Sequence, residues 1–369
     1  MRVESSIPPQ ALASIRAPFL DANAAPTDAP VLQPLALLLD LAGEAMRSRV
    51  FVVQGERGEE SALRPDFTIP IARAHIDSGA ASGRYLYEGK AFRVAPTGSG
   101  RAEEFLQIGL EAYGGATPAE DDAEVAALAW RAATAGGRDD LTLQLGDVSL
   151  FAAFIDSLDL EPRLGGRLQR AFTRPRLLKA ELDGEARDTE ASRIAALLAG
   201  LPEAEAVGVL EELWALAGID PVGGRSAADI AHRLVERAEV VQGARLTSAQ
   251  ADRIRGYLSI SDTPDRALDK VAKLSGDISA ALETWSRRLA AMVEQGADPR
   301  RMRLSTAFSR AFGYYDGVLF EVRSAALDEE RPVAAGGRYD GLTVRLGGQP
   351  STAVGCTIRP VRAFVGGVE

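Results

Sequence analysis

The sequence contains very few of the residues that build disulfide frameworks and metal centres. Its 369 residues include one cysteine and two histidines. A lone cysteine, Cys356, excludes an intramolecular disulfide and fits a reducing compartment. It lies in the apolar run TAVGCTI, which favours a small buried hydrophobe over a catalytic thiol. With His75 and His232 as the only imidazole ligands available, we expect no metal site.

Long apolar runs and an excess of positive charge are also lacking. No stretch approaches the roughly 20 apolar residues of a membrane-spanning helix, and the opening segment MRVESSIPPQALASI lacks the apolar core of a signal peptide. The net charge of −10 and the pI near 5.0 argue against a broad nucleic-acid-binding surface, which needs clustered lysine and arginine. We therefore expect a cytoplasmic protein whose partners are neither membranes nor nucleic acids.

The composition is that of an ordinary globular protein, with 46% hydrophobic and 25% charged residues. Strand-like segments crowd residues 49–113, and GERGEE, at 55–60, is typical of a hairpin tip. Residues 117–137 form a predicted helix, in which Thr117 and Glu120 have the spacing of a capping box. The predicted fold class is α+β, with an antiparallel sheet flanked by helices.

The sequence divides into three regions that differ in composition and in the periodicity of their apolar residues. Residues 1–150 and 296–369 carry the strand-like segments, whereas residues 151–295 contain Ala, Leu, Glu and Arg at helical spacing. We interpret the middle region as a helical insertion between two halves of one core. Trp214 and Trp285 within it are expected in the hydrophobic core rather than in a recognition surface.

The first polar motif is LRPDFT, at residues 63–68. Its Arg-Pro pair gives a rigid turn that aims the carboxylate of Asp66 and the hydroxyl of Thr68 in one direction. Such a pair suits an ammonium group, which donates three hydrogen bonds. The motif alone is explained equally simply by a turn in which Asp66 accepts hydrogen bonds from the backbone, and by itself it favours that interpretation.

The second motif is EEFLQIGLEAYG, at residues 103–114. Strand alternation places Gln107, Gly109 and Glu111 on one face of a sheet. Polar side chains are costly to bury without partners, so this face meets either water or a ligand. Glu111 could accept a hydrogen bond from an imidazole, and Gln107 could meet a carboxylate or an ammonium group. A solvated sheet face remains an equal alternative at this point.

Two further motifs lie near the C-terminus. In SRAFGYYDGVLFEV, at 309–322, Arg310 falls in a loop, and strand alternation predicts that Tyr314 and Tyr315 point to opposite faces. In AAGGRYDGL, at 334–342, the glycines permit a close backbone approach, and the arginine and aspartate can pair locally. Alone, this motif indicates no more than a tight turn between two strands.

Together, in order and spacing, these stretches resemble the catalytic domain of histidyl-tRNA synthetase, a class II aminoacyl-tRNA synthetase. LRPDFT resembles that family's LRPEGT, and YEGKAFR with GRAEEFLQIGLEAYG resembles its motif 2 hairpin. RAFGYY is similar to RGLDYY, AAGGRYDGL to GGGRYDGL, and STAVGCTIRPVRAF lies where motif 3 belongs. Pro30 marks motif 1, the dimer-forming element. The resemblance covers about residues 30–150 and 300–365.

The resemblance implies a histidine-binding site made of Asp66, Thr68, Arg93, Gln107, Glu111, Arg310, Tyr314 and Tyr315. The first two would receive the α-ammonium group, and the next two would hold the carboxylate end. Glu111, with Tyr314 or Tyr315, would recognise the imidazole. Arg310 aligns with the family's catalytic arginine and is the one feature that favours activation chemistry.

The nucleotide half of the resembling site departs from the family pattern. Ala95 stands where the family has the glutamate that helps hold the adenine end of ATP, and Glu103 replaces a basic residue, so it would repel phosphates. Arg359 replaces the motif 3 glycine that leaves space for the nucleotide, although Arg362 is retained. Gly313 replaces the aspartate of RGLDYY. We therefore expect no catalytic residues and no cofactor.

The sequence also ends a few residues after motif 3, so we expect no anticodon-binding domain, which in the synthetase has about a hundred residues. These features resemble the regulatory subunits of ATP phosphoribosyltransferase, which act in the first step of histidine biosynthesis. That resemblance implies a non-catalytic chain needed for the activity of a short-form catalytic subunit and for feedback by free histidine. It also implies a homodimer within a hetero-oligomer. The alternatives are a truncated ligase that activates an amino acid with ATP, and a scaffold whose pocket binds nothing.

Overall fold

A computed structural model describes residues 2–42, 44–56, 58–184, 205, 207–209, 212, 245–309 and 314–367. By its internal contacts the chain divides into two compact units, one made of Met1–Ser157 with Gly256–Glu369 and the other of Leu158–Arg255. The predicted insertion, 151–295, runs past the second unit at both ends. Trp285 is 1% exposed, as expected for a core residue, and Trp214 lies outside the described residues.

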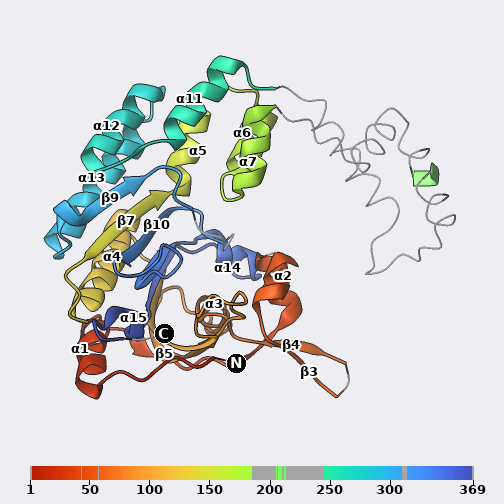
Figure 1. Cartoon of the computed structure of the whole chain (residues 1–369). Helices are drawn as coiled ribbons and strands as arrows, with labels where there is room; N and C mark the ends of the chain where they lie inside the picture. The colour runs from red at the N-terminus through yellow and green to blue at the C-terminus, as the bar shows by residue number, and fades with distance from the viewer. Residues whose placement is uncertain are drawn as a thin grey trace. The chain divides into compact units, whose positions relative to one another are not determined.

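Within the described residues, the first unit contains a nine-stranded sheet (Figure 1) in the order β1-β5-β6-β12-β11-β10-β7-β9-β8. The six consecutive strands from β5 to β7 are all antiparallel to their neighbours, whereas β1 and β9 pair in parallel with β5 and β7. The predicted antiparallel α+β fold is therefore confirmed. The strands are β1 (Ala25–Pro26), β5 (Gly83–Phe92), β6 (Glu104–Tyr113), β7 (Leu141–Asp147), β8 (Ser261–Asp262), β9 (Met302–Ser305), β10 (Val318–Ser324), β11 (Ala334–Arg338) and β12 (Ala353–Ile358).

A second, three-stranded sheet holds the segments that precede the LRPDFT motif. Its strands are β2 (Leu32–Pro34), β3 (Val52–Gln54) and β4 (Glu60–Leu63), in the order β2-β4-β3. The predicted hairpin tip is confirmed, since β3 pairs antiparallel with β4 and the Gly55 N–H donates to the Glu59 carbonyl at 2.9 Å. These strands form a sheet of their own, and after β4 the chain enters α3 (Thr68–Ser78).

The alanine-rich helix α4 (Pro118–Thr134) packs between the main sheet and other helices. It contacts β10, β11 and β12 as well as α1 (Pro9–Leu20) and α13 (Ser279–Glu294). Its alanines are almost all fully buried, and their small side chains allow neighbours to approach from several sides. Thr117 occupies the N-cap position, but its side chain makes no capping hydrogen bond, so the predicted capping box does not form.

Two short helices on the opposite side of the sheet from α4 (Figure 1) border the candidate site: α3, which contacts β6, and α14 (Gly341–Arg345), which contacts α3. The remaining elements of the first unit are α2 (Leu35–Ala42), η1 (Glu44–Arg49), α5 (Val148–Asp156), α12 (Pro264–Leu274), η2 (Pro299–Arg301) and α15 (Pro360–Ala363). Among the helices that the structure describes, none has the length and apolar character needed to cross a membrane.

The described part of the second unit is helical. It contains α6 (Pro162–Ala171), α7 (Pro175–Asp183) and the start of α11 (Ser248–Leu258). Arg167 on α6 pairs with Glu181 on α7 at 3.3 Å, and Arg255 on α11 pairs with Asp183 at 2.9 Å. The first contact joins neighbouring helices, and the second joins α7 to a helix that is far away in the sequence.

A buried network of charged side chains ties α4 to α13 and to the main sheet. Asp122 on α4 is fully buried and accepts hydrogen bonds from Arg288 Nε at 3.0 Å and from Arg338 Nε at 2.8 Å. Arg338 also makes the predicted local pair with Asp340, at 2.9 Å. Arg338 is the last residue of β11, so the network fixes the end of this strand. The rest of the 334–342 motif follows directly and leads to the candidate site.

Candidate functional site

Glu111 is the centre of the polar face on β6. Its side chain is 1% exposed, and that of Gln107 is 2% exposed. The Thr68 hydroxyl donates to Glu111 Oε1 at 2.8 Å, and the Tyr339 hydroxyl donates to Glu111 Oε2. The predicted alternation on β6 thus leads to buried polar groups rather than to a solvated sheet face, and the LRPDFT motif supplies one of the partners.

Gly109, between these two polar residues, allows close packing at the same face. A Cβ atom there would lie 2.2 Å from the Tyr87 hydroxyl and 2.3 Å from the carbonyl oxygen of Cys356. Since Cβ atoms do not approach other heavy atoms so closely, glycine is required for Tyr87 to pack across β6.

The side chains that surround Glu111 enclose a cavity with a volume of about 20 Å³. Six of the eight predicted residues line it, namely Asp66, Thr68, Arg93, Glu111, Tyr314 and Tyr315. Gln107 is buried on the same strand but is not part of the lining, and Arg310 lies outside the described residues. Segments that are far apart in the sequence therefore meet around one small polar cavity, which we call the Glu111 pocket.

Six lining residues were not part of the predicted site: Tyr87, Ala335, Tyr339, Gly355, Cys356 and Thr357. Tyr339 is the important one, because it is 1% exposed and bonds directly to Glu111. The only signal for it was its place in the AAGGRYDGL motif, where the local pattern indicated a turn. Its position depends on β11 pairing with β12 and on β12 pairing with β6.

Tyr314 and Tyr315 do not point to opposite faces of a strand, so that prediction was wrong. Their ring centroids lie 4.6 Å apart, and both rings lie within about 6 Å of Tyr339, at 5.8 Å and 6.2 Å. The reason is that β10 begins only at Val318, so strand alternation does not apply to the two tyrosines. Both rings can therefore line the Glu111 pocket.

Burial dominates the electrostatics of this pocket. It raises the pKa of Glu111 to about 8, and the nearby charge of Asp66 adds to the effect, while hydrogen bonds from Tyr339 and Thr68 oppose it. Burial also raises the pKa values of Tyr339 and Tyr314 well above the ordinary range, so their hydroxyls stay neutral. At neutral pH, Glu111 therefore carries a proton that it can share with a bound group.

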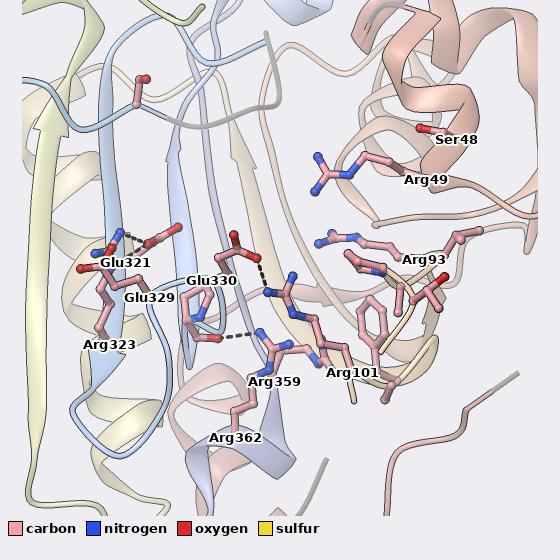
Figure 2. A pocket seen from close by; sticks show the side chains of 18 of the residues that line it. Ser48, Arg49, Arg93, Arg101, Glu321, Arg323, Glu329, Glu330, Arg359 and Arg362 are labelled. Atoms are coloured by element: carbon pink, nitrogen blue, oxygen red, sulfur yellow. Dashed lines mark hydrogen bonds and ion pairs between the residues drawn. The ribbon is translucent and has the colours of Figure 1, made fainter. Parts of the chain in front are cut away.

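A second and larger cavity, of about 580 Å³, adjoins the first, and Arg93 lines both. We call it the basic cavity (Figure 2), because its lining contains six arginines: Arg49, Arg93, Arg101, Arg323, Arg359 and Arg362. Three glutamates also line it, namely Glu321, Glu329 and Glu330. Ala95 lies in the same wall, where the resembling family has an acid.

Two residues that depart from the family pattern in the nucleotide half, Arg359 and Glu103, lie in positions that the sequence did not predict. Arg359 covers one wall of the cavity rather than its interior: its guanidinium carbon lies 3.6 Å from the centre of the Phe105 ring and its Nη2 pairs with Glu4 at 2.6 Å. Glu103 is absent from the lining of the basic cavity and instead accepts from the Arg2 N–H at 3.0 Å. The cavity is thus altered in its walls but remains open.

Comparisons with known proteins agree with this architecture. The family model described as histidyl-tRNA synthetase matches residues 27–248 and 205–362. A solved structure from Bacillus halodurans C, titled an ATP phosphoribosyltransferase regulatory subunit/histidyl-tRNA synthetase, superposes with a TM-score of 0.66 at 19% identity, covering 100% of this chain and 83% of its own. The histidyl-tRNA synthetase of Nostoc sp. PCC 7120 superposes with a TM-score of 0.60 at 16% identity, covering 96% of this chain and 69% of its own. These likenesses establish the fold.

Curated relatives are more similar in sequence. The ATP phosphoribosyltransferase regulatory subunit of Brucella anthropi is 34% identical over 344 residues, which are 90% of each chain. That of Brucella ovis is 35% identical over 328 residues, or 86% of each chain. With a histidyl-tRNA synthetase fold and relatives at this identity over almost its full length, the chain belongs to the family of ATP phosphoribosyltransferase regulatory subunits.

Proposed function

We propose that this chain is the regulatory subunit of an ATP phosphoribosyltransferase in the first step of histidine biosynthesis, and that it binds free histidine in the Glu111 pocket without catalysing a reaction. The observation that carries the proposal is that Glu111 and five other predicted residues line one pocket. The buried Asp66 carboxylate and the Thr68 hydroxyl suit an α-ammonium group, and Arg93 suits a carboxylate. Glu111 and Tyr339 offer polar atoms to an imidazole.

The volume of the pocket indicates how binding would act on the rest of the complex. A cavity of about 20 Å³ holds roughly one water molecule, so histidine must displace side chains to enter. Tyr314 and Tyr315 precede β10 and are less constrained by the sheet than Glu111 or Tyr339. A ligand that binds one arrangement of a protein better than another shifts the equilibrium, typically by about 1–3 kcal/mol, or 5- to 150-fold.

The proposed partners are a short-form catalytic subunit and a second copy of this chain. Support for self-association comes from the three-stranded sheet near motif 1, which exposes apolar side chains on β2, on β3 and next to them. Those side chains are Val31 (43% exposed), Leu32 (51%), Val52 (40%) and Val53 (39%). We place the assembly in the reducing cytoplasm, in keeping with the single buried thiol of Cys356.

Reconstitution tests the proposed function directly. A short-form catalytic subunit assayed with ATP and phosphoribosyl pyrophosphate is expected to be active only when this chain is added, and histidine is expected to inhibit the mixture. The Glu111→Ala variant should still activate the catalytic subunit, because the side chain lies in the pocket rather than on the surface, but the mixture should need far more histidine for inhibition. No activation by the wild-type chain would refute the function, and unchanged feedback in the variant would move the histidine site elsewhere.

The pKa of Glu111 predicts how histidine binding depends on pH. Between pH 6.5 and pH 8, protonated Glu111 meets a neutral imidazole, and the complex keeps the single proton that the pair already holds. Below pH 6.5 the free imidazole is also protonated, so one proton must leave on binding. Affinity should therefore fall by about eightfold from pH 7 to pH 5.5, as a ligand pKa of about 6.5 requires.

Calorimetry at the two pH values, in buffers that differ in ionisation enthalpy, measures both the affinity and the number of protons released. Release of about one proton at pH 5.5 is expected. An affinity that rises toward acid would mean that Glu111 is already ionised in the free protein and attracts the imidazolium, which contradicts the burial argument.

A further inference from the structure

The basic cavity is a concentration of positive charge on an acidic protein. The chain carries a net charge of −10, yet the lining of this one cavity has six arginines against three glutamates. Its volume of about 580 Å³ lies within the range of about 300–1,000 Å³ that is usual for small-molecule sites. A hollow of this size and charge is suited to a small anion, since guanidinium groups bind phosphates and carboxylates with paired hydrogen bonds.

Two of the arginines extend into the cavity from the same wall (Figure 2). Arg49 ends η1 and Arg93 follows β5, and their guanidinium groups point in the same direction. The backbone holds the two segments together, because the Val94 N–H donates to the Arg49 carbonyl at 3.0 Å. Arg93 is fixed further by a hydrogen bond from its Nε to the Pro65 carbonyl at 2.8 Å. Two guanidinium groups that point in the same direction into one cavity can both donate hydrogen bonds to the oxygens of a phosphate group.

Glutamates already pair with the arginines at the other walls. Arg101 pairs with Glu330, whose side chain is 72% exposed and belongs to the loop between β10 and β11. Arg323 pairs with Glu321 at 2.8 Å. Each of these carboxylates occupies a position at which an oxygen of an anionic ligand could accept hydrogen bonds from the same guanidinium group. The Glu330 pair is the weaker obstacle to a ligand, because an exposed ion pair contributes little free energy.

The aromatic faces of the cavity are not available to a nucleobase. Arg359 lies on Phe105 at 3.6 Å, and Arg323 lies on Phe308 at 5.3 Å. Glu4 holds Arg359 in that place, since its Oε1 pairs with Arg359 at 2.6 Å while its Oε2 accepts from the Leu106 N–H at 3.0 Å. Glu4 and Arg359 are both buried, so a base that stacked on Phe105 would have to break a buried ion pair.

We propose that the basic cavity binds a small anion with two or more linked phosphate groups and no nucleobase, and that the Glu4–Arg359 pair excludes the base. Arg49 and Arg93 are placed to hold one phosphate group. The second phosphate reaches Arg101, from which it displaces Glu330. This site shares the guanidinium group of Arg93 with the Glu111 pocket, whereas Arg49 and Arg101 line the basic cavity and not the Glu111 pocket.

Calorimetric titration of the full chain with inorganic pyrophosphate tests the proposal, with orthophosphate, citrate and ATP as comparison ligands. At low ionic strength we expect pyrophosphate to bind at least about tenfold more tightly than the other three, and its affinity should fall as salt is added. Arg49→Gln should weaken pyrophosphate binding by about 5- to 10-fold. Arg47→Gln is the matched control, because Arg47 lies in the same element but pairs with Glu60 outside the cavity, and its binding should be unchanged.

Two further variants separate the phosphate site from the exclusion of the base. Glu330→Gln should tighten pyrophosphate binding about two- to fivefold, because it frees Arg101 from its carboxylate. Glu4→Gln combined with Arg359→Gly removes both members of the buried pair, and it should allow ATP to bind at least about tenfold more tightly than it binds the wild-type chain.

Several outcomes would overturn the proposal. No pyrophosphate binding at millimolar concentration would remove the site, and equal affinity for citrate would mean that charge alone is recognised. Wild-type affinity for ATP equal to that for pyrophosphate would refute the exclusion of the base. A histidine titration of the same Arg49→Gln sample keeps the two sites apart, since its affinity for histidine should match that of the wild-type chain whichever way the pyrophosphate result falls.

Discussion

Glu111→Ala is expected to weaken histidine binding more than about 100-fold, which corresponds to about 3 kcal/mol. The substitution removes the carboxyl group that would recognise the imidazole. It also leaves the hydroxyls of Thr68 and Tyr339 without the acceptor to which they now donate. Calorimetry of the isolated variant measures the loss. Glu111→Gln keeps an acceptor oxygen at nearly the same place but lacks the proton that Glu111 shares with the imidazole, so it should lose only about tenfold, the cost of one hydrogen bond.

Glu104→Ala is the matched control for this series. Glu104 lies on the same strand, but its carboxylate faces Lys90 at 3.7 Å and does not line the pocket. Histidine affinity should therefore stay within about twofold of the wild-type value, as for a surface ion pair. If Glu111→Ala bound histidine as tightly as Glu104→Ala, the amino acid would not occupy this pocket, and the scaffold alternative would gain support.

Asp122→Asn is expected to lower the free energy of unfolding of the first unit by about 3–5 kcal/mol. Asp122 is fully buried and is shared by Arg288 and Arg338, which are 6% and 7% exposed. Removing its charge leaves two buried guanidinium groups without their common partner. The amide is the same size as the carboxyl group, so a cavity cannot account for the loss. Urea unfolding followed by circular dichroism measures it.

Glu124→Gln provides the comparison on the same helix. Glu124 pairs with Arg84 at 2.5 Å, but the two side chains are 35% and 29% exposed. Such a pair contributes about 1 kcal/mol or less, so this variant should unfold almost as the wild type does. Equal losses in the two variants would mean that the Asp122 network contributes no more than a surface pair.

Local patterns supplied two parts of the Glu111 pocket, but each part also had an explanation that needed no ligand. Alternation along β6 placed Gln107 and Glu111 together, and the LRPDFT motif paired Asp66 with Thr68. The resemblance to histidyl-tRNA synthetase then joined segments that no local rule connects. The same rules failed for Tyr314 and Tyr315, because a strand period was applied to residues that precede the strand.

Contacts between distant residues lay beyond any local pattern. Tyr339 reaches Glu111 only through the pairing of β11, β12 and β6. Arg359 was expected to obstruct the nucleotide, but the sequence could not reveal that Glu4, 355 positions earlier, holds its guanidinium group on Phe105. The N-terminal segment also takes Glu103 away from the cavity, through the Arg2 N–H. Each error concerns the partner of a side chain rather than the fold.

The two cavities share one lining residue, Arg93, and differ in the groups that they present. The Glu111 pocket contains polar groups that suit a free amino acid. In the basic cavity, the guanidinium group of Arg359 covers the Phe105 ring on which a nucleobase could otherwise stack. Because Arg93 lines both cavities, a ligand that moves its side chain in one cavity changes the binding of a ligand in the other. Activation of histidine requires that histidine and ATP bind together, and the walls of the basic cavity disfavour ATP.

The most direct measurement is therefore histidine-dependent exchange of labelled pyrophosphate into ATP by the purified chain, at a histidine concentration that saturates it by calorimetry. Our account predicts histidine binding with no exchange above background, because the Glu4–Arg359 pair keeps ATP from its place beside the amino acid. Exchange that requires histidine would show adenylate formation, and the chain would then be a ligase rather than a regulatory subunit.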